Sequence, residues 1–152
     1  MRAWRAFIET VQDLLTALEA DLSRQGLTVG DYQVLVHLAE QEHHSMRMCD
    51  LASRLQLSPS GLTRRLDGLV RTGLVSRRPS PDDGRVILAV LTDDGRRELE
   101  RVAPHHVASV RHHLIDRVAP SDLEAMARVF EAVRAGLDSP LGDGEPALGR
   151  RR

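Results

Sequence analysis

The sequence predicts a mainly α-helical fold with one small β-hairpin, and three observations support this prediction. Apolar residues recur every three or four positions over most of the 152 residues, as they do along one face of a helix. Capping residues and glycines mark where these helical segments begin and end. Between 74 and 91 the pattern changes to two short β-type runs joined by a turn-rich segment.

Four helices are predicted before the hairpin. The first spans 4–22 and ends before Gly26, and the second is capped by Thr28 with Asp31. The charged, histidine-rich segment 40–45 is expected to be the exit from the second helix.

A third, short helix is predicted within 48–55. A fourth opens at Ser58-Pro59, where the serine caps the helix and the proline occupies its first turn, and it stops at Gly73.

Two longer helices are predicted after the hairpin. The first opens at 92–95 and continues towards 114, with a kink expected at Pro104. The last starts at a capping box formed by Ser121 and Glu124. The Gly- and Pro-rich tail 139–152 is expected to be disordered.

The composition favours one globular domain and excludes several function classes. Apolar residues make up 41% and charged residues 28%, whereas aromatic residues make up only 3%, too few for stacking on single-stranded nucleic acid. The sequence has no apolar run long enough for a membrane span and no signal-peptide core, so we expect a cytoplasmic protein with no membrane partner. A single cysteine, Cys49, rules out an internal disulfide.

Basic residues are concentrated in the middle of the chain. The net charge is −1, yet the segment 54–97 holds nine arginines and five aspartates, a net charge of +4. The chain contains no lysine, which we attribute partly to genomic composition, although arginine also suits contacts to phosphate and guanine.

Two short helices with a tight turn between them, followed by a hairpin, predict a winged helix-turn-helix whose second helix enters the major groove of duplex DNA. A helical wheel places Leu62, Leu66, Leu69 and Val70 on the core side. The residues predicted to contact DNA from this helix and its N-terminal turn are Ser58, Pro59, Ser60, Thr63, Arg64, Arg65 and Arg71.

Two residues of this helix need a qualification. Arg65 points closer to the core stripe, so its stem is expected to pack while its head reaches a phosphate or an acid. Asp67 would repel DNA, so we expect it to pair with Arg64 or Arg71 at helical spacing.

The hairpin turn 82–85 supplies a second predicted DNA contact. It places Arg85 at the end of an arm, where its guanidinium can enter the minor groove, with Asp83 holding that guanidinium in position. An ordinary exposed Asp-Gly turn is the alternative for this segment alone.

These motifs together resemble the MarR (multiple antibiotic resistance regulator) family. The resemblance covers the second to fifth helices and is most specific in Asp83-Gly84-Arg85, followed by Leu91-Thr92-Asp93-Asp94-Gly95. It implies a transcriptional regulator that binds a pseudo-palindromic operator as a homodimer, most commonly a repressor, with Arg85 as the wing arginine and Asp83 as its orienting partner. Many members carry a second arginine where this chain has Gly84.

The resemblance also suggests a domain plan. We expect one regulator domain at 1–138, with a DNA-binding lobe at about 28–95 and dimerisation helices at about 3–24 and 95–138. The apolar stripes of the first and last helices favour dimerisation independently, because each needs a surface to bury against.

The family further implies a small effector, often an anionic aromatic compound, bound between the dimerisation helices and the DNA-binding lobe. Candidate lining residues are Trp4, His37, Cys49 and His105, although a tryptophan on an apolar stripe is more often core. No cofactor or metal is predicted. The seven histidines leave a zinc-sensing regulator as an alternative, but they show no close i, i+4 pair.

Two other function classes fit the sequence less well. An enzyme is disfavoured because the sequence contains no phosphate-binding glycine loop, nucleophile elbow or catalytic His/carboxylate arrangement. A winged helix that binds only protein would keep the fold, but it would have no need of an arginine at the wing tip.

Overall fold

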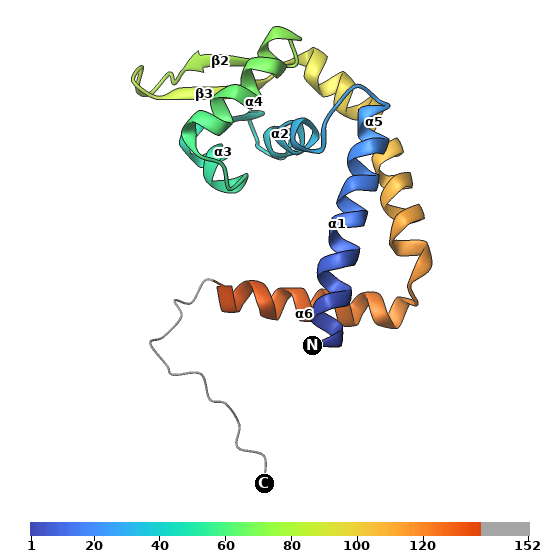
Figure 1. The fold of residues 1–152 in the computed structure, drawn as a ribbon. Coiled ribbons are helices and arrows are strands. Elements are labelled where there is room, and N and C mark those ends of the chain that lie inside the picture. Colours follow the sequence, from blue (N-terminus) through green and yellow to red (C-terminus); the bar gives the residue numbers. More distant parts are fainter. Residues whose placement is uncertain (138–152) are drawn as a thin grey trace. The chain divides into compact units, whose positions relative to one another are not determined.

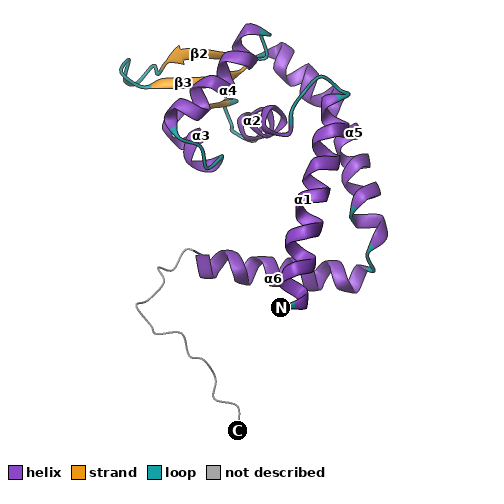
Figure 2. Cartoon of the chain, in the orientation of Figure 1, coloured by secondary structure: helices purple, strands orange, loops and turns teal. Residues whose placement is uncertain are grey.

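A computed structural model describes residues 1–137 (Figures 1 and 2). The predicted disorder at 139–152 lies outside the described residues. In chain order the elements are α1 (Arg2–Ser23), α2 (Val29–Ala39), β1 (Ser45–Arg47), α3 (Met48–Arg54), α4 (Pro59–Arg71), β2 (Val75–Pro79), β3 (Ile87–Leu91), α5 (Asp93–His113), a 3-10 turn (Ile115–Arg117) and α6 (Pro120–Leu137). The mainly helical fold class with a small hairpin is thus confirmed. None of the helices described is long and apolar enough to cross a membrane.

Residue contacts divide the chain into two compact units, Met1–Leu114 and a second that starts at Ile115. The prediction of a single domain over 1–138 stays a prediction. In the second unit α6 begins at Pro120, so Ser121 lies inside the first turn and the predicted N-cap there is wrong. Proline is favoured at the first helical position because its φ is already helical and its missing N–H has no partner to lose.

Three of the other predicted helix starts are confirmed by side-chain caps. The Thr28 hydroxyl accepts from the Asp31 N–H at 3.0 Å, and the Asp31 carboxylate accepts from the Thr28 N–H at 3.2 Å. Ser58 accepts from the Gly61 N–H at 3.1 Å to start α4, and Thr92 starts α5 in the same way. Each cap satisfies a backbone donor that the first helical turn leaves free.

The sheet has three antiparallel strands in the order β1-β3-β2, drawn in orange in Figure 2. Strands β2 and β3 form the predicted hairpin, with Arg77 opposite Ala89. Strand β1 was not predicted, because 40–45 was expected to be the exit from a helix. Its three residues are too few for a period-two pattern, and only pairing with β3 makes them a strand.

The core lies in the first unit, where α2, α4 and the sheet contribute most of the buried side chains. α1 contributes Leu22 and α5 contributes Val102, so both long helices are anchored to this core. On α4 the three leucines of the predicted core stripe are buried, but Val70 is 37% exposed and was wrongly placed in that stripe. α5 continues through Pro104.

Candidate nucleic-acid interface

Helices α3 and α4 form the helix-turn-helix, and the chain reverses between them at Gln56. Its φ of 53° is left-handed, and the Leu57 N–H donates to the Ala52 carbonyl at 2.9 Å, which closes the turn. The buried Leu51 and Ala52 pack α3 into the core. The turn therefore holds the N-terminus of α4 at a fixed place on the surface.

The face of α4 opposite its buried leucines is polar and exposed. Of the residues predicted to contact DNA from this helix and its N-terminal turn, all but Arg65 are exposed: Ser58, Pro59, Ser60, Thr63, Arg64 and Arg71. The Thr63 hydroxyl donates to the Pro59 carbonyl at 2.9 Å, so towards a ligand its oxygen is left mainly as an acceptor. The exposed guanidinium of Arg64 can supply donors to base edges or phosphates.

Arg65 lies differently from its neighbours. Its guanidinium Nη1 is 3.5 Å from the Thr28 hydroxyl and 4.0 Å from the Asp31 carboxylate at the start of α2, and its side chain is 33% exposed. The guanidinium of Arg65 therefore lies near an acid, which is one of the two contacts expected for it. Its contact to DNA stays a prediction.

Asp67 pairs with a residue that was not among its predicted partners. Its carboxylate accepts from Arg77 Nη1 at 2.8 Å, and Arg77 Nη2 donates to the Thr63 carbonyl at 2.9 Å. The predicted pairing with Arg64 or Arg71 is wrong. Spacing along a helix can suggest only local partners, whereas Arg77 reaches Asp67 from strand β2.

The wing tip carries Arg85 with its side chain exposed. Asp83 accepts from the backbone N–H of Arg85 at 3.0 Å, and the Asp83 carbonyl accepts from the Val86 N–H at 2.9 Å. Asp83 therefore shapes the backbone of the turn here, in place of the guanidinium contact that we expected. The guanidinium itself is available to a ligand from a turn of fixed shape.

A hollow of about 530 Å³ lies between α4 and the wing. The residues that line it are Arg47, Met48, Cys49, Thr63, Arg77, Arg85, Val86 and Ile87. Arg47 was missed because the basic segment was counted only from residue 54. Cys49 was predicted to line an effector cleft, but the structure places it here, with Arg47, Arg77 and Arg85.

The other effector candidates are not brought together. Trp4 is 61% exposed near the start of α1 and lines a small hollow there, whereas His105 lines a separate one beside Asp21. His37 lies on α2, with Nδ1 buried and 3.8 Å from Glu40. These residues do not form one cleft in the described chain.

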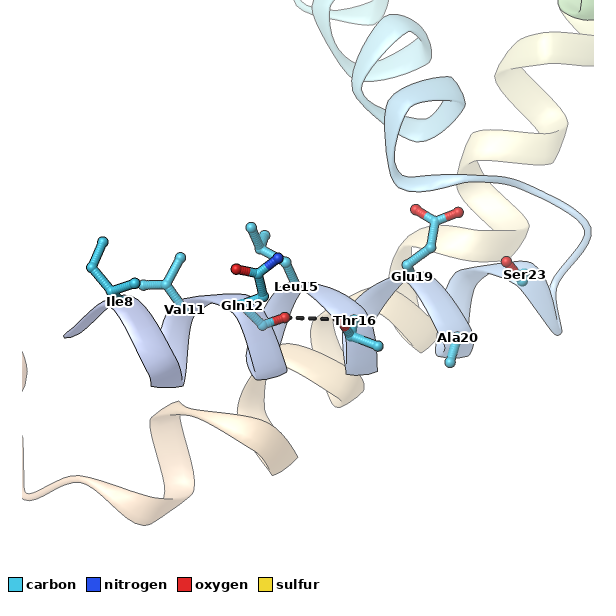
Figure 3. A pocket seen from close by; sticks show the side chains of 8 residues that line it. All are labelled: Ile8, Val11, Gln12, Leu15, Thr16, Glu19, Ala20 and Ser23. Atoms are coloured by element: carbon cyan, nitrogen blue, oxygen red, sulfur yellow. Dashed lines mark hydrogen bonds between the residues drawn. The ribbon is translucent and has the colours of Figure 1, made fainter. Parts of the chain in front are cut away.

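A hollow of about 680 Å³ follows one face of α1 (Figure 3). Its lining residues are Ile8, Val11, Gln12, Leu15, Thr16, Glu19, Ala20 and Ser23. At its α2 end the Glu19 carboxylate accepts from the Val29 N–H at 2.9 Å, which joins α1 to the start of α2. Of the residues of α1, only Trp4 was predicted to line an effector site.

A polar cluster joins α1 to α5. The Asp21 carboxylate accepts from the Ser109 hydroxyl, lies 2.9 Å from His113 Nε2 and also pairs with Arg24. These contacts, with Ser109 first and His113 second, hold the pKa of Asp21 below its ordinary value. Among the described residues, no three histidine, cysteine or acidic side chains are grouped so that they could hold a metal ion.

An exposed polar helix beside an arginine-tipped hairpin defines a winged helix-turn-helix of the kind that binds duplex DNA. The model of the MarR family matches residues 25–86. The HTH-type transcriptional repressor YetL of Bacillus subtilis is 33% identical over 117 residues, which cover 75% of this chain and 70% of YetL.

Two solved structures from Streptomyces coelicolor are also similar. AbsC, a MarR family transcriptional regulator, is 41% identical with a TM-score of 0.85, over 90% of this chain and 92% of AbsC. Sco3205, a MarR family regulator solved in complex with DNA, is 34% identical with a TM-score of 0.85, over 93% of this chain and 89% of Sco3205. The chain belongs to the MarR family of transcriptional regulators. Its members are regulators and not enzymes, so the expectation of a non-enzyme is confirmed by family membership.

Proposed function

We propose that this protein is a homodimeric, ligand-responsive repressor that binds a pseudo-palindromic operator, with α4 in the major groove and Arg85 in the adjacent minor groove. One observation carries the proposal: Thr63 of α4 and Arg85 of the wing line the same arginine-rich hollow. With α4 in one groove of a duplex and the wing in the next, the phosphate backbone between the two grooves would lie in this hollow.

The comparisons support this assignment. YetL is named a repressor, and Sco3205 is described in complex with DNA. Sco3205 shares the fold of this chain, and the described part of this chain carries an exposed arginine, Arg85, at the wing. A regulator of transcription works where the chromosome lies, so we assign the protein to the cytoplasm.

Dimerisation is supported by exposed apolar residues on two helices. On α1 these include Trp4, Ile8 and Leu15, and on α6 they include Val129 and Val133. Large apolar side chains repeated along a helix face in this way are typical of a protein interface. A two-fold dimer would set two recognition helices roughly 34 Å apart, one turn of the duplex.

The small effector is assigned to the α1 hollow, which shares Ile8 and Leu15 with the proposed dimer interface. Its apolar wall suits an aromatic ring, and its volume is in the range of small-ligand sites. A ligand bound there would change DNA binding only if it bound one of the two states of the dimer more tightly than the other.

Fluorescence anisotropy tests the proposal, with duplexes selected from a random pool and with the wild type compared with Arg85→Ala over a salt series. We expect specific binding that weakens by about 1–3 kcal/mol in Arg85→Ala. Arg5→Ala, which removes an exposed arginine from α1, is the matched control and should bind like the wild type. Binding no tighter to selected than to random duplex, and unchanged by Arg85→Ala, would leave a protein-binding winged helix as the better account.

A further inference from the structure

Arg77 connects the two elements that are proposed to contact DNA. Its guanidinium donates from Nη1 to the Asp67 carboxylate at 2.8 Å and from Nη2 to the Thr63 carbonyl at 2.9 Å. Both acceptors are on α4, whereas Arg77 is on β2, the first strand of the wing. The planar fork of an arginine fixes both distance and orientation between the elements that it joins.

The position of Arg77 in the sheet anchors this link between α4 and the wing in the core, near the wing tip. Arg77 lies opposite Ala89 in the β2–β3 ladder, and Ala89 is fully buried. The strand that holds α4 is therefore itself held by the core. Arg77 and Arg85 line the same hollow, so the connection lies directly beside the proposed DNA path.

Simple stabilisation does not account for the Asp67–Arg77 pair. The Asp67 side chain is 55% exposed and that of Arg77 is 29% exposed, and exposed ion pairs contribute little to stability. Asp67 also lies on the exposed face of α4, where an acid repels the phosphates of DNA. Neither stability nor attraction to DNA therefore explains an acid at position 67.

We infer that Arg77 and Asp67 are positioning residues, which set the angle between α4 and the wing so that both fit one operator half-site. This inference rests on the proposed function, since it concerns how the DNA-binding face is aligned. It gives Asp67 a role in specificity although its charge opposes binding.

The sign of one substitution separates this role from electrostatics. Asp67→Asn removes a negative charge near DNA, so charge alone predicts tighter binding to any duplex. Loss of alignment predicts weaker binding to the operator, by about tenfold or 1.4 kcal/mol at 25 °C, with no loss on a scrambled duplex.

The experiment measures anisotropy on selected and scrambled duplexes for the wild type, Asp67→Asn, Arg77→Met and the double variant. Thermal unfolding of each confirms that it is folded. We expect the ratio of specific to non-specific affinity to fall in both single variants, and the double variant to be no worse than Arg77→Met. Asp82→Asn, which removes an exposed acid of the wing loop, is the charge control and should affect both duplexes alike.

Two results would overturn the inference. Asp67→Asn that binds the operator as tightly as the wild type, or more tightly, would show that the acid has no positioning role. Additive losses in the double variant would show that Arg77 acts as an independent phosphate contact. A wild type with no preference for the selected duplex is a different failure, because it removes the proposed function and the inference with it.

Discussion

Nε2 of His113 lies 2.9 Å from Oδ2 of Asp21, so the last turn of α5 is bonded to α1. The Ser109 hydroxyl donates to the same oxygen. Two donors on one face of α5 thus converge on one half-buried carboxylate. α1 and α5 are the long helices of the first unit, and this cluster fixes one against the other.

The stability of the protein should depend on the charge of Asp21. Hydrogen bonds from Ser109 and His113 hold its folded-state pKa below its ordinary value of about 3.9. A lowered carboxyl pKa contributes stability that is present above the ordinary pKa and is lost as pH falls through the folded pKa. We therefore expect Asp21→Asn to flatten the fall in the free energy of unfolding below about pH 4.

Urea unfolding between about pH 3 and 6 at fixed protein concentration measures this slope. Asp13→Asn is the matched control, because Asp13 is exposed on the same helix. Equal slopes in the wild type and Asp21→Asn would show that the cluster does not hold the carboxylate in its charged form.

His106 should give a pH dependence of the same sign, at higher pH. Its ring lies against Tyr32 with centroids 4.5 Å apart, and burial lowers its pKa. The folded protein then holds fewer protons than the unfolded chain, so stability falls as pH drops below about 6.5. His106→Phe keeps an aromatic ring there without the titrating group, and we expect it to flatten stability between about pH 7 and 5.

His105→Phe is the control for this prediction, because His105 is the neighbouring residue and is exposed. Thermal unfolding in matched buffers measures the pH dependence of stability in both variants. If His106→Phe keeps the wild-type dependence, another group causes it.

The features that sequence reasoning found are local ones. Ser58, Thr28 and Thr92 cap helices whose partners lie three residues away, so a short window contains the whole interaction. The buried leucines of α4 follow from periodicity for the same reason, because one helix turn fixes which face they share.

The features that it missed depend on tertiary pairing. Asp67 finds its partner ten residues away on a strand, in preference to an arginine on its own helix. Strand β1 exists only because β3 lies beside it. Cys49 lies near the wing because the fold brings α3 next to it, which no spacing along the chain reveals.

Gly95 should not tolerate a larger residue. A Cβ there would lie 2.0 Å from the Leu74 carbonyl oxygen and 2.7 Å from Leu91 Cδ1, in a buried site where α5 starts against the sheet. Gly95→Ala forces backbone to move, so we expect a loss of about 1–3 kcal/mol or more in unfolding free energy. Gly68→Ala is the control: a Cβ at Gly68 meets no atom within 4 Å, and a helix gains roughly 0.5–1 kcal/mol from this change. Equal stability of the two variants would contradict the close packing at Gly95.

Leu15 tests whether α1 forms the dimer interface. Its side chain is 53% exposed on the wall of the α1 hollow, so it contributes little to the core of its own protomer. Leu15→Glu would place an unpaired charge in an apolar interface, and we expect the dimer dissociation constant to rise at least about tenfold with the monomer still folded. Sedimentation equilibrium measures the constant, and Asp13→Ala, on an exposed position of α1, should leave it unchanged.

A monomeric Leu15→Glu should also lose operator affinity, because one recognition helix can then contact only one half-site. An unaltered dimer would move the interface away from this face of α1.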